Sequence, residues 1–198
     1  MNVQLGRFGH QIVNNLIAEG LSTASPGSGM YLLYGPVPSL QSLNIKFGRA
    51  MEKWFEEAVR VGHNNFTVMK SGVWKEISKD LDLIFRDDDN NIIYYRELKL
   101  NLNLDTEKIV STYEKIAHIR SFLNNKYPGY EIDAAALTWG VYDKDDMTAQ
   151  SKIKKASEYN VAVEDPSAFF KLVGTEISKP EYFSYFRQLG ARLGKLNG

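Results

Sequence analysis

Hydrophobic residues recur at helical spacing in several stretches of the chain. In the clearest stretch, from about residue 45 to 60, one face of the expected helix is apolar and the opposite face is largely charged. The apolar face consists of Phe47, Met51, Trp54, Phe55 and Ala58. Further helices are predicted at about 7–19, 106–123, 147–158, 166–173 and 181–196. The polar helix at 147–158 shows this pattern least.

Capping residues mark the ends of two of these helices. Asp105 directly precedes the helix that starts at Thr106, and Asp is a favoured N-cap residue because its carboxylate accepts orphan backbone N–H groups. Asp165 and Pro166 have the pattern of an N-cap and a first helical turn, and Gly174 follows where that helix should end.

Strand-like runs lie between the helices. DLDLIF (80–85) and IIYYRELKL (92–100) are joined by the polar segment RDDDNN (86–91), which predicts a β-hairpin. AAALTWGVY (134–142) is almost uninterruptedly apolar, as in a strand covered on both faces, and VAVE (161–164) predicts a short strand. The order of elements predicts an α/β fold with a mixed central β-sheet flanked by helices.

Length and composition are those of a globular protein. The chain has 198 residues, of which 43% are hydrophobic and 24% charged, so one domain with a substantial core is expected. We place its core at about 45–174, with appended elements at 1–44 and 175–198. No apolar run reaches the roughly 18 residues of a membrane span, and the first residues lack the apolar centre of a signal peptide. A cytoplasmic protein without a membrane partner is therefore expected.

The residue inventory restricts the chemistry. The absence of cysteine excludes thiolate metal sites and cysteine nucleophiles, and three scattered histidines do not suggest a dense imidazole cluster. Any metal would be held largely by oxygen. The formal net charge is zero, but residues 43–79 are net basic and residues 80–89 net acidic. A basic segment is thus followed directly by an acidic one.

The hairpin carries the residues with the clearest chemical potential. Side chains alternate along a strand, so Asp80 and Asp82 should share one face, and Glu97 and Lys99 should share a face of the partner strand. Adjacent carboxylates repel each other unless a divalent cation neutralises them, and Mg²⁺ prefers oxygen ligands. A lysine beside such a metal suits metal-assisted phosphodiester hydrolysis. The alternative is a solvated strand face on which Glu97 and Lys99 form an ordinary ion pair.

KDLDLIF (79–85) followed by YYRELK (94–99) resembles the bipartite motif of the PD-(D/E)XK nuclease superfamily, and ELKLNLNLDTEK (97–108) is similar to the matching segment of type II restriction endonucleases. The resemblance extends to GRAMEKWFEEAV (48–59) and to the elements of 134–174, although Leu81 replaces the motif's proline. It implies a restriction-endonuclease-like (PD-(D/E)XK) core and a Mg²⁺-dependent, site-specific deoxyribonuclease of a restriction-modification system.

The resemblance also implies individual roles. Asp82 and Glu97 would be metal ligands together with the carbonyl of Leu98, Lys99 would be the catalytic lysine, and Glu52 would be an accessory carboxylate reached through water. Asp80 is the competing choice for the first aspartate, because a two-residue slip of the hairpin would place it opposite Glu97.

Double-stranded DNA is the expected partner. The candidate DNA-binding residues precede the first strand or follow Lys99, and their side chains suit contacts to phosphates and base edges. They are Lys70, Ser71, Lys75, Lys79, Asn101 and Asn103. Cutting both strands calls for two catalytic centres, so a homodimer is expected, with a heterodimer as the alternative. The apolar C-terminal stripe, which consists of Phe183, Phe186, Leu189 and Leu193, could form the interface or cover the core of the same chain. A structure-specific resolvase or repair nuclease of the same fold, or a non-catalytic DNA-binding subunit, are the alternative functions.

Overall fold

The computed structural model describes residues 3–19, 40–62, 65–102, 106–143 and 150–194. The described helices are α1 (Val3–Glu19), α3 (Leu40–Gly62), α4 (Thr106–Lys126), α5 (Gln150–Glu158), α6 (Pro166–Val173) and α7 (Lys179–Gly194). The described strands are β1 (Phe66–Val68), β2 (Gly72–Trp74), β3 (Lys79–Leu81), β4 (Leu83–Asp87), β5 (Ile92–Lys99), β6 (Glu131–Thr138) and β7 (Ala162–Glu164). None of the described helices is long and apolar enough to cross a membrane.

A mixed five-stranded sheet lies at the centre. Its strand order is β1-β4-β5-β6-β7, with antiparallel pairing of β1 to β4 and of β4 to β5, and parallel pairing of β5 to β6 and of β6 to β7. This confirms the predicted α/β class with a mixed sheet, an architecture compatible with a restriction-endonuclease-like fold. The strands β2 and β3 form a separate two-stranded sheet.

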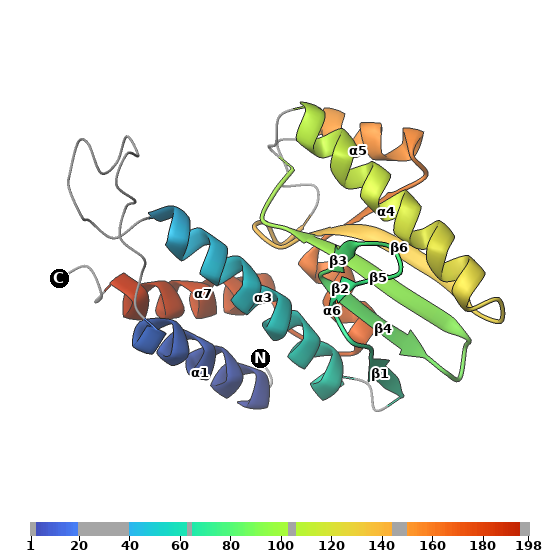
Figure 1. Ribbon diagram of the computed structural model, residues 1–198. Helices are drawn as coiled ribbons and strands as arrows, with labels where there is room; N and C mark the ends of the chain where they lie inside the picture. Colours follow the sequence, from blue (N-terminus) through green and yellow to red (C-terminus); the bar gives the residue numbers. More distant parts are fainter. Residues whose placement is uncertain (1–2, 20–39, 63–64, 103–105, 144–149, 195–198) are drawn as a thin grey trace.

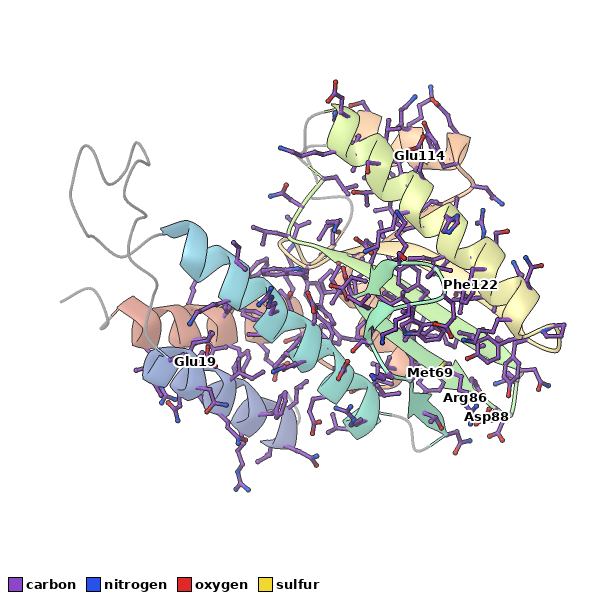
Figure 2. All side chains as sticks on the ribbon, viewed as in Figure 1. Glu19, Met69, Arg86, Asp88, Glu114 and Phe122 are labelled. Atoms are coloured by element: carbon purple, nitrogen blue, oxygen red, sulfur yellow. The ribbon has the colours of Figure 1, made fainter. Side chains whose placement is uncertain are left out.

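Helices cover both faces of the central sheet. Figure 1 shows α4 and α5 on one side, and α3, α1 and α7 on the other. Alternate side chains of the strands pack against one or the other of these two helical layers. Ile84, Ile93 and Tyr95 belong to the hydrophobic cluster under α4, and Phe85 and Tyr94 belong to the cluster that α3, α6 and α7 complete. Side chains from α3 and the sheet fill the space between them (Figure 2).

The terminal helices are part of the main core. Leu5 and Val13 of α1 and Leu189 of α7 are buried in the same cluster as Trp54 of α3, and Phe186 packs against it. The apolar stripe near the C-terminus therefore covers the core of its own chain. The ends that we expected to be appended add a helical layer to α3.

Local capping explains the ends of α6. The Asp165 carboxylate accepts a hydrogen bond from the Ala168 N–H at 2.8 Å, Pro166 occupies the first turn, and Gly174 adopts the left-handed conformation with φ of 69°. All three features were predicted. The proposed cap of α4, Asp105, lies outside the described residues.

The predicted hairpin forms, with its turn closed by polar side chains. The Asp87 carboxylate accepts hydrogen bonds from the N–H groups of Asp89 and Asn90, each at 3.1 Å, and Asn91 adopts a positive φ of 54°. Such local side-chain bonds and left-handed conformations are typical of Asp and Asn in turns. The turn fixes the register at Leu83↔Arg96 through Asp87↔Ile92.

Two strand boundaries differ from the prediction. The run 80–85 is not one strand, because the chain leaves the central sheet at Asp82: β3 pairs with β2, whereas β4 pairs with β5. Asp80 and Asp82 therefore do not share a face of one continuous strand. The strand expected at 134–142 instead runs from Glu131 to Thr138, parallel to β5 along that strand's full length.

Candidate active site

Glu97 and Lys99 lie at the end of β5, on the face toward α4. Glu97 is buried, with only 2% of its surface exposed. The Lys99 ammonium donates a hydrogen bond to Oε1 of Glu97 at 2.7 Å. Leu98 between them joins the hydrophobic cluster of the opposite face. The period-two alternation of the strand thus brings the carboxylate and the lysine together, as the sequence predicted.

Asp82 joins this pair because the sheet splits there. The last paired residues of the β4–β5 ladder are Leu83 and Arg96, and two residues farther along β5 the Leu98 N–H donates to Oδ2 of Asp82 at 2.8 Å. The side chain of Asp82 therefore satisfies a backbone donor beyond the end of the ladder, as buried N–H groups require. This bond ties Asp82 to the backbone between Glu97 and Lys99.

Asp80 lies in a different setting. It is exposed on β3 and is the register partner of Val73 on β2. The hairpin register and the Leu98 hydrogen bond select Asp82, not Asp80, as the neighbour of Glu97.

A second lysine, Lys115 of α4, completes the cluster. Its Nζ atom lies 2.6 Å from Oε2 of Glu97 and 3.8 Å from Oδ1 of Asp82, and its side chain is 20% exposed. The Tyr95 hydroxyl also donates to Oε2 of Glu97. Sequence reasoning missed Lys115. The sequence gives only a weak indication of its role. Lys115 directly precedes Ile116, an apolar residue of α4, but this position does not show which strand the helix covers.

Glu52 approaches from the other helical layer, on α3. Burial raises its pKa to about 7, with further contributions from the negative charges of Asp82 and Asp80. The predicted accessory carboxylate is therefore within electrostatic reach of the site. A carboxyl group with this pKa exchanges its proton near neutral pH.

Asp82 and Glu97 differ in their electrostatic environment. Burial raises the pKa of Asp82 to about 6, and the charge of Glu97 adds to the effect. Burial would likewise raise the pKa of Glu97, but Lys99 and Lys115 outweigh it and hold that pKa below its usual value. Burial would lower the pKa of Lys99, yet Glu97 reverses the effect and raises it. The ion pair of Glu97 with Lys99 is thus charged at neutral pH.

Part of the chain is similar to a known restriction enzyme. A stretch of 56 residues, 28% of the chain, is 38% identical to the type II restriction enzyme HinfI of Haemophilus influenzae. The matched stretch spans 21% of the length of HinfI, so the similarity supports a restriction-endonuclease-like family and no particular member of it. No family model matches the chain.

The donor set at this site fits a magnesium ion that also takes substrate and water ligands. Among the residues that the structure describes, no group of three or more His, Cys, Asp or Glu side chains could hold a metal by itself. Mg²⁺ is commonly bound by only one or two carboxylates together with waters and phosphate oxygens. Asp82 and Glu97 supply two carboxylates.

The backbone at Leu98 is oriented for the third expected ligand. The Lys99 carbonyl accepts a hydrogen bond from the Trp139 N–H on the β6 side of the strand, at 2.9 Å. Successive carbonyls of a strand point to opposite sides, and the N–H and C=O of one residue point to the same side. The Leu98 carbonyl therefore faces the side on which its N–H binds Asp82.

The chain beyond β5 is held close to β6. The Gly140 N–H donates to the Leu100 carbonyl at 2.6 Å, and a Cβ atom at Gly140 would lie 2.2 Å from that oxygen. Only glycine permits this approach. It anchors the backbone directly after Lys99.

The candidate DNA-binding residues lie on the flanks of the site. Four of them surround the small β2–β3 sheet, and Asn101 is exposed shortly after β5. The lysines Lys70, Lys75 and Lys79 are exposed, whereas the Ser71 hydroxyl donates to the Glu56 carboxylate of α3. Asn103 lies outside the described residues.

Proposed function

We propose that the protein is a Mg²⁺-dependent endonuclease that hydrolyses phosphodiester bonds of double-stranded DNA at specific sites, as a type II restriction enzyme does. The observation that supports this proposal most is the arrangement of Asp82, Glu97 and Lys99 at the place where the sheet splits. The Lys99 ammonium donates to Glu97 at 2.7 Å, and Asp82 accepts from the backbone N–H of the residue between them at 2.8 Å. The partial similarity to HinfI supports the same class of reaction.

Asp82, Glu97 and the Leu98 carbonyl would hold the metal ion. When bound, the ion supplies charge neutralisation at the phosphate and a more acidic water. Lys99, whose pKa is raised, carries its proton and can donate a hydrogen bond to a phosphate oxygen or to the attacking water. Lys99 would therefore orient the attacking water or the phosphate and stabilise negative charge there.

Glu52 is the group best suited to accept a proton. General bases work most efficiently when their pKa lies near the working pH, and burial raises the pKa of Glu52 to about 7 in the metal-free protein. Its carboxylate can take a proton from water at the site and pass it to solvent, because the side chain is only partly buried.

The exposed lysines beside the site would bind DNA backbone. Lys70, Lys75 and Lys79 project from the segment that leads into Asp82, so phosphates bound there would pass close to the carboxylates. A protein of zero net charge with local basic residues suits an enzyme that must leave non-cognate DNA.

Cutting both strands would require two copies of the site. We propose a homodimer, with a heterodimer as the alternative. The C-terminal stripe is a poor candidate for its interface, since Leu189 is buried and Phe186 packs against the core of the same chain.

Digestion of a sequenced plasmid tests the function. With Mg²⁺ the wild-type protein should yield discrete fragments, and the Lys99→Ala variant should yield none while it still folds and binds DNA. Lys154→Ala, at an exposed position of α5, is the matched control and should cut normally. Wild-type cutting by the Lys99→Ala variant would refute the assignment. Cutting of branched DNA alone would favour a resolvase, and DNA binding without cutting would favour a non-catalytic subunit.

A further inference from the structure

Lys115 of α4 forms an ion pair with the buried Glu97 carboxylate of β5. Its ammonium lies 2.6 Å from one oxygen of Glu97, while Lys99 lies 2.7 Å from the other oxygen. Both oxygens of the buried carboxylate therefore face lysines. Lys115 Nζ also lies 3.8 Å from Oδ1 of Asp82.

These contacts place Lys115 against both proposed metal ligands. A divalent cation bound by Asp82 and Glu97 would have to share or replace the position that its ammonium occupies, because the same two carboxylates hold both cations. Two cations that bind the same anions compete electrostatically, and the competition is strong in a partly buried site where the effective dielectric constant is low.

We propose that Lys115 is a positioning residue that acts as an internal counter-cation: it balances and orients the Asp82 and Glu97 carboxylates before a divalent cation arrives, and the incoming cation displaces it from them. This inference rests on the proposed function for the identity of the metal ligands. Displacement leaves the Lys115 ammonium next to the bound cation, where it can pair with a phosphate oxygen of DNA. Metal and DNA would then bind cooperatively.

The fold supports this role for Lys115. Tyr113 and Ile116 on either side of it are fully buried and anchor this turn of α4 against the sheet. The lysine therefore reaches the site from a fixed backbone, on a flexible side chain that can move without movement of the helix. Tyr95, whose hydroxyl donates to Glu97, provides a second contact that keeps the carboxylate in place when Lys115 leaves.

The direction in which Mn²⁺ affinity changes when Lys115 loses its charge distinguishes this role from a purely structural one. Lys115→Met removes a competing positive charge, so Mn²⁺ alone should bind about tenfold more tightly, the scale expected for a unit charge a few ångströms away. Plasmid cleavage should nevertheless fall, because the ammonium is no longer available to the phosphate. Lys115→Arg should restore Mn²⁺ affinity toward the wild-type value.

Isothermal titration of Mn²⁺ into the wild-type, Lys115→Met, Lys115→Arg and Lys154→Met proteins makes the measurement, with circular dichroism to verify folding. Lys154→Met should match the wild type. Unchanged or weaker Mn²⁺ binding by folded Lys115→Met would overturn the proposal, as would the absence of Mn²⁺ binding by all four. If Lys115→Met does not fold, Lys115→Gln takes its place under the same criteria.

The same proteins separate this inference from the proposed function. If Mn²⁺ binding changes as expected and no protein cuts any DNA, Lys115 is a counter-cation in a site that is not a nuclease. If the wild type cuts plasmid and the Lys115→Met variant neither binds Mn²⁺ more tightly nor cuts less, the nuclease assignment stands and the role of Lys115 is refuted.

Discussion

Replacing Glu52 by glutamine should stabilise the metal-free protein at alkaline pH. The folded protein raises the pKa of Glu52 from 4.5 to about 7, so the folded state binds this proton more tightly than the unfolded state does. The corresponding stability is present below about pH 4.5 and is lost as the pH rises through about 7. Glutamine keeps the shape of the side chain and cannot ionise, so the variant avoids that loss.

The size of the effect follows from the pKa. The rise in the pKa of Glu52 from 4.5 to about 7 corresponds to about 3 kcal/mol, because each tenfold change in proton affinity corresponds to about 1.36 kcal/mol. Because the side chain is only partly buried, solvent screening reduces the expected gain to about 1–2 kcal/mol. For a chain of this length, each kcal/mol corresponds to about 2–4 °C in Tm.

Urea unfolding in EDTA, followed by tryptophan fluorescence at several values between about pH 5 and 8, measures the effect. The Glu52→Gln variant should gain stability over the wild type as the pH rises. The gain should narrow when Mg²⁺ replaces EDTA in the buffer, because the cation offsets the repulsion between the carboxylates. Glu114→Gln, at an exposed position of α4 (Figure 2), should show no such trend. A stability difference that does not change with pH, or a less stable Glu52→Gln variant at about pH 8, would refute the reasoning.

Three further predictions concern the site and its support. Asp82→Asn should abolish metal-dependent cleavage, whereas Asp80→Asn should retain measurable activity in plasmid digestion, because only Asp82 binds the backbone beside Glu97; the reverse ranking would contradict this reading. Ca²⁺ should support DNA binding in a gel-shift assay without turnover, because it is larger and activates water poorly, and cutting in excess EDTA would disprove the metal requirement. Arg96→Met should lower the free energy of unfolding by about 3–5 kcal/mol, since it leaves the Glu164 carboxylate, whose side chain is only 13% exposed, without its buried partner. A loss below about 1 kcal/mol in chemical denaturation would show that the ion pair is not needed.

The sequence by itself determined the features that depend on local periodicity and local capping. The alternation of a strand places Glu97 and Lys99 on one face, and an Asp followed by Pro starts α6, whatever the rest of the chain does. The polar turn between β4 and β5 likewise depends on residues close in the sequence. These features were predicted because the interactions that create them span only a few residues.

Only the tertiary structure decided which distant groups meet. Asp82 is distinguished from Asp80 by the split of the sheet, where the Leu98 N–H lies beyond the end of the β4–β5 ladder and donates to Asp82. Lys115 joins the cluster because α4 packs across β5, and its place on the helix does not reveal that docking. Such contacts depend on strand register and helix packing, which are set by the burial of the whole core and not by the pattern of any one segment.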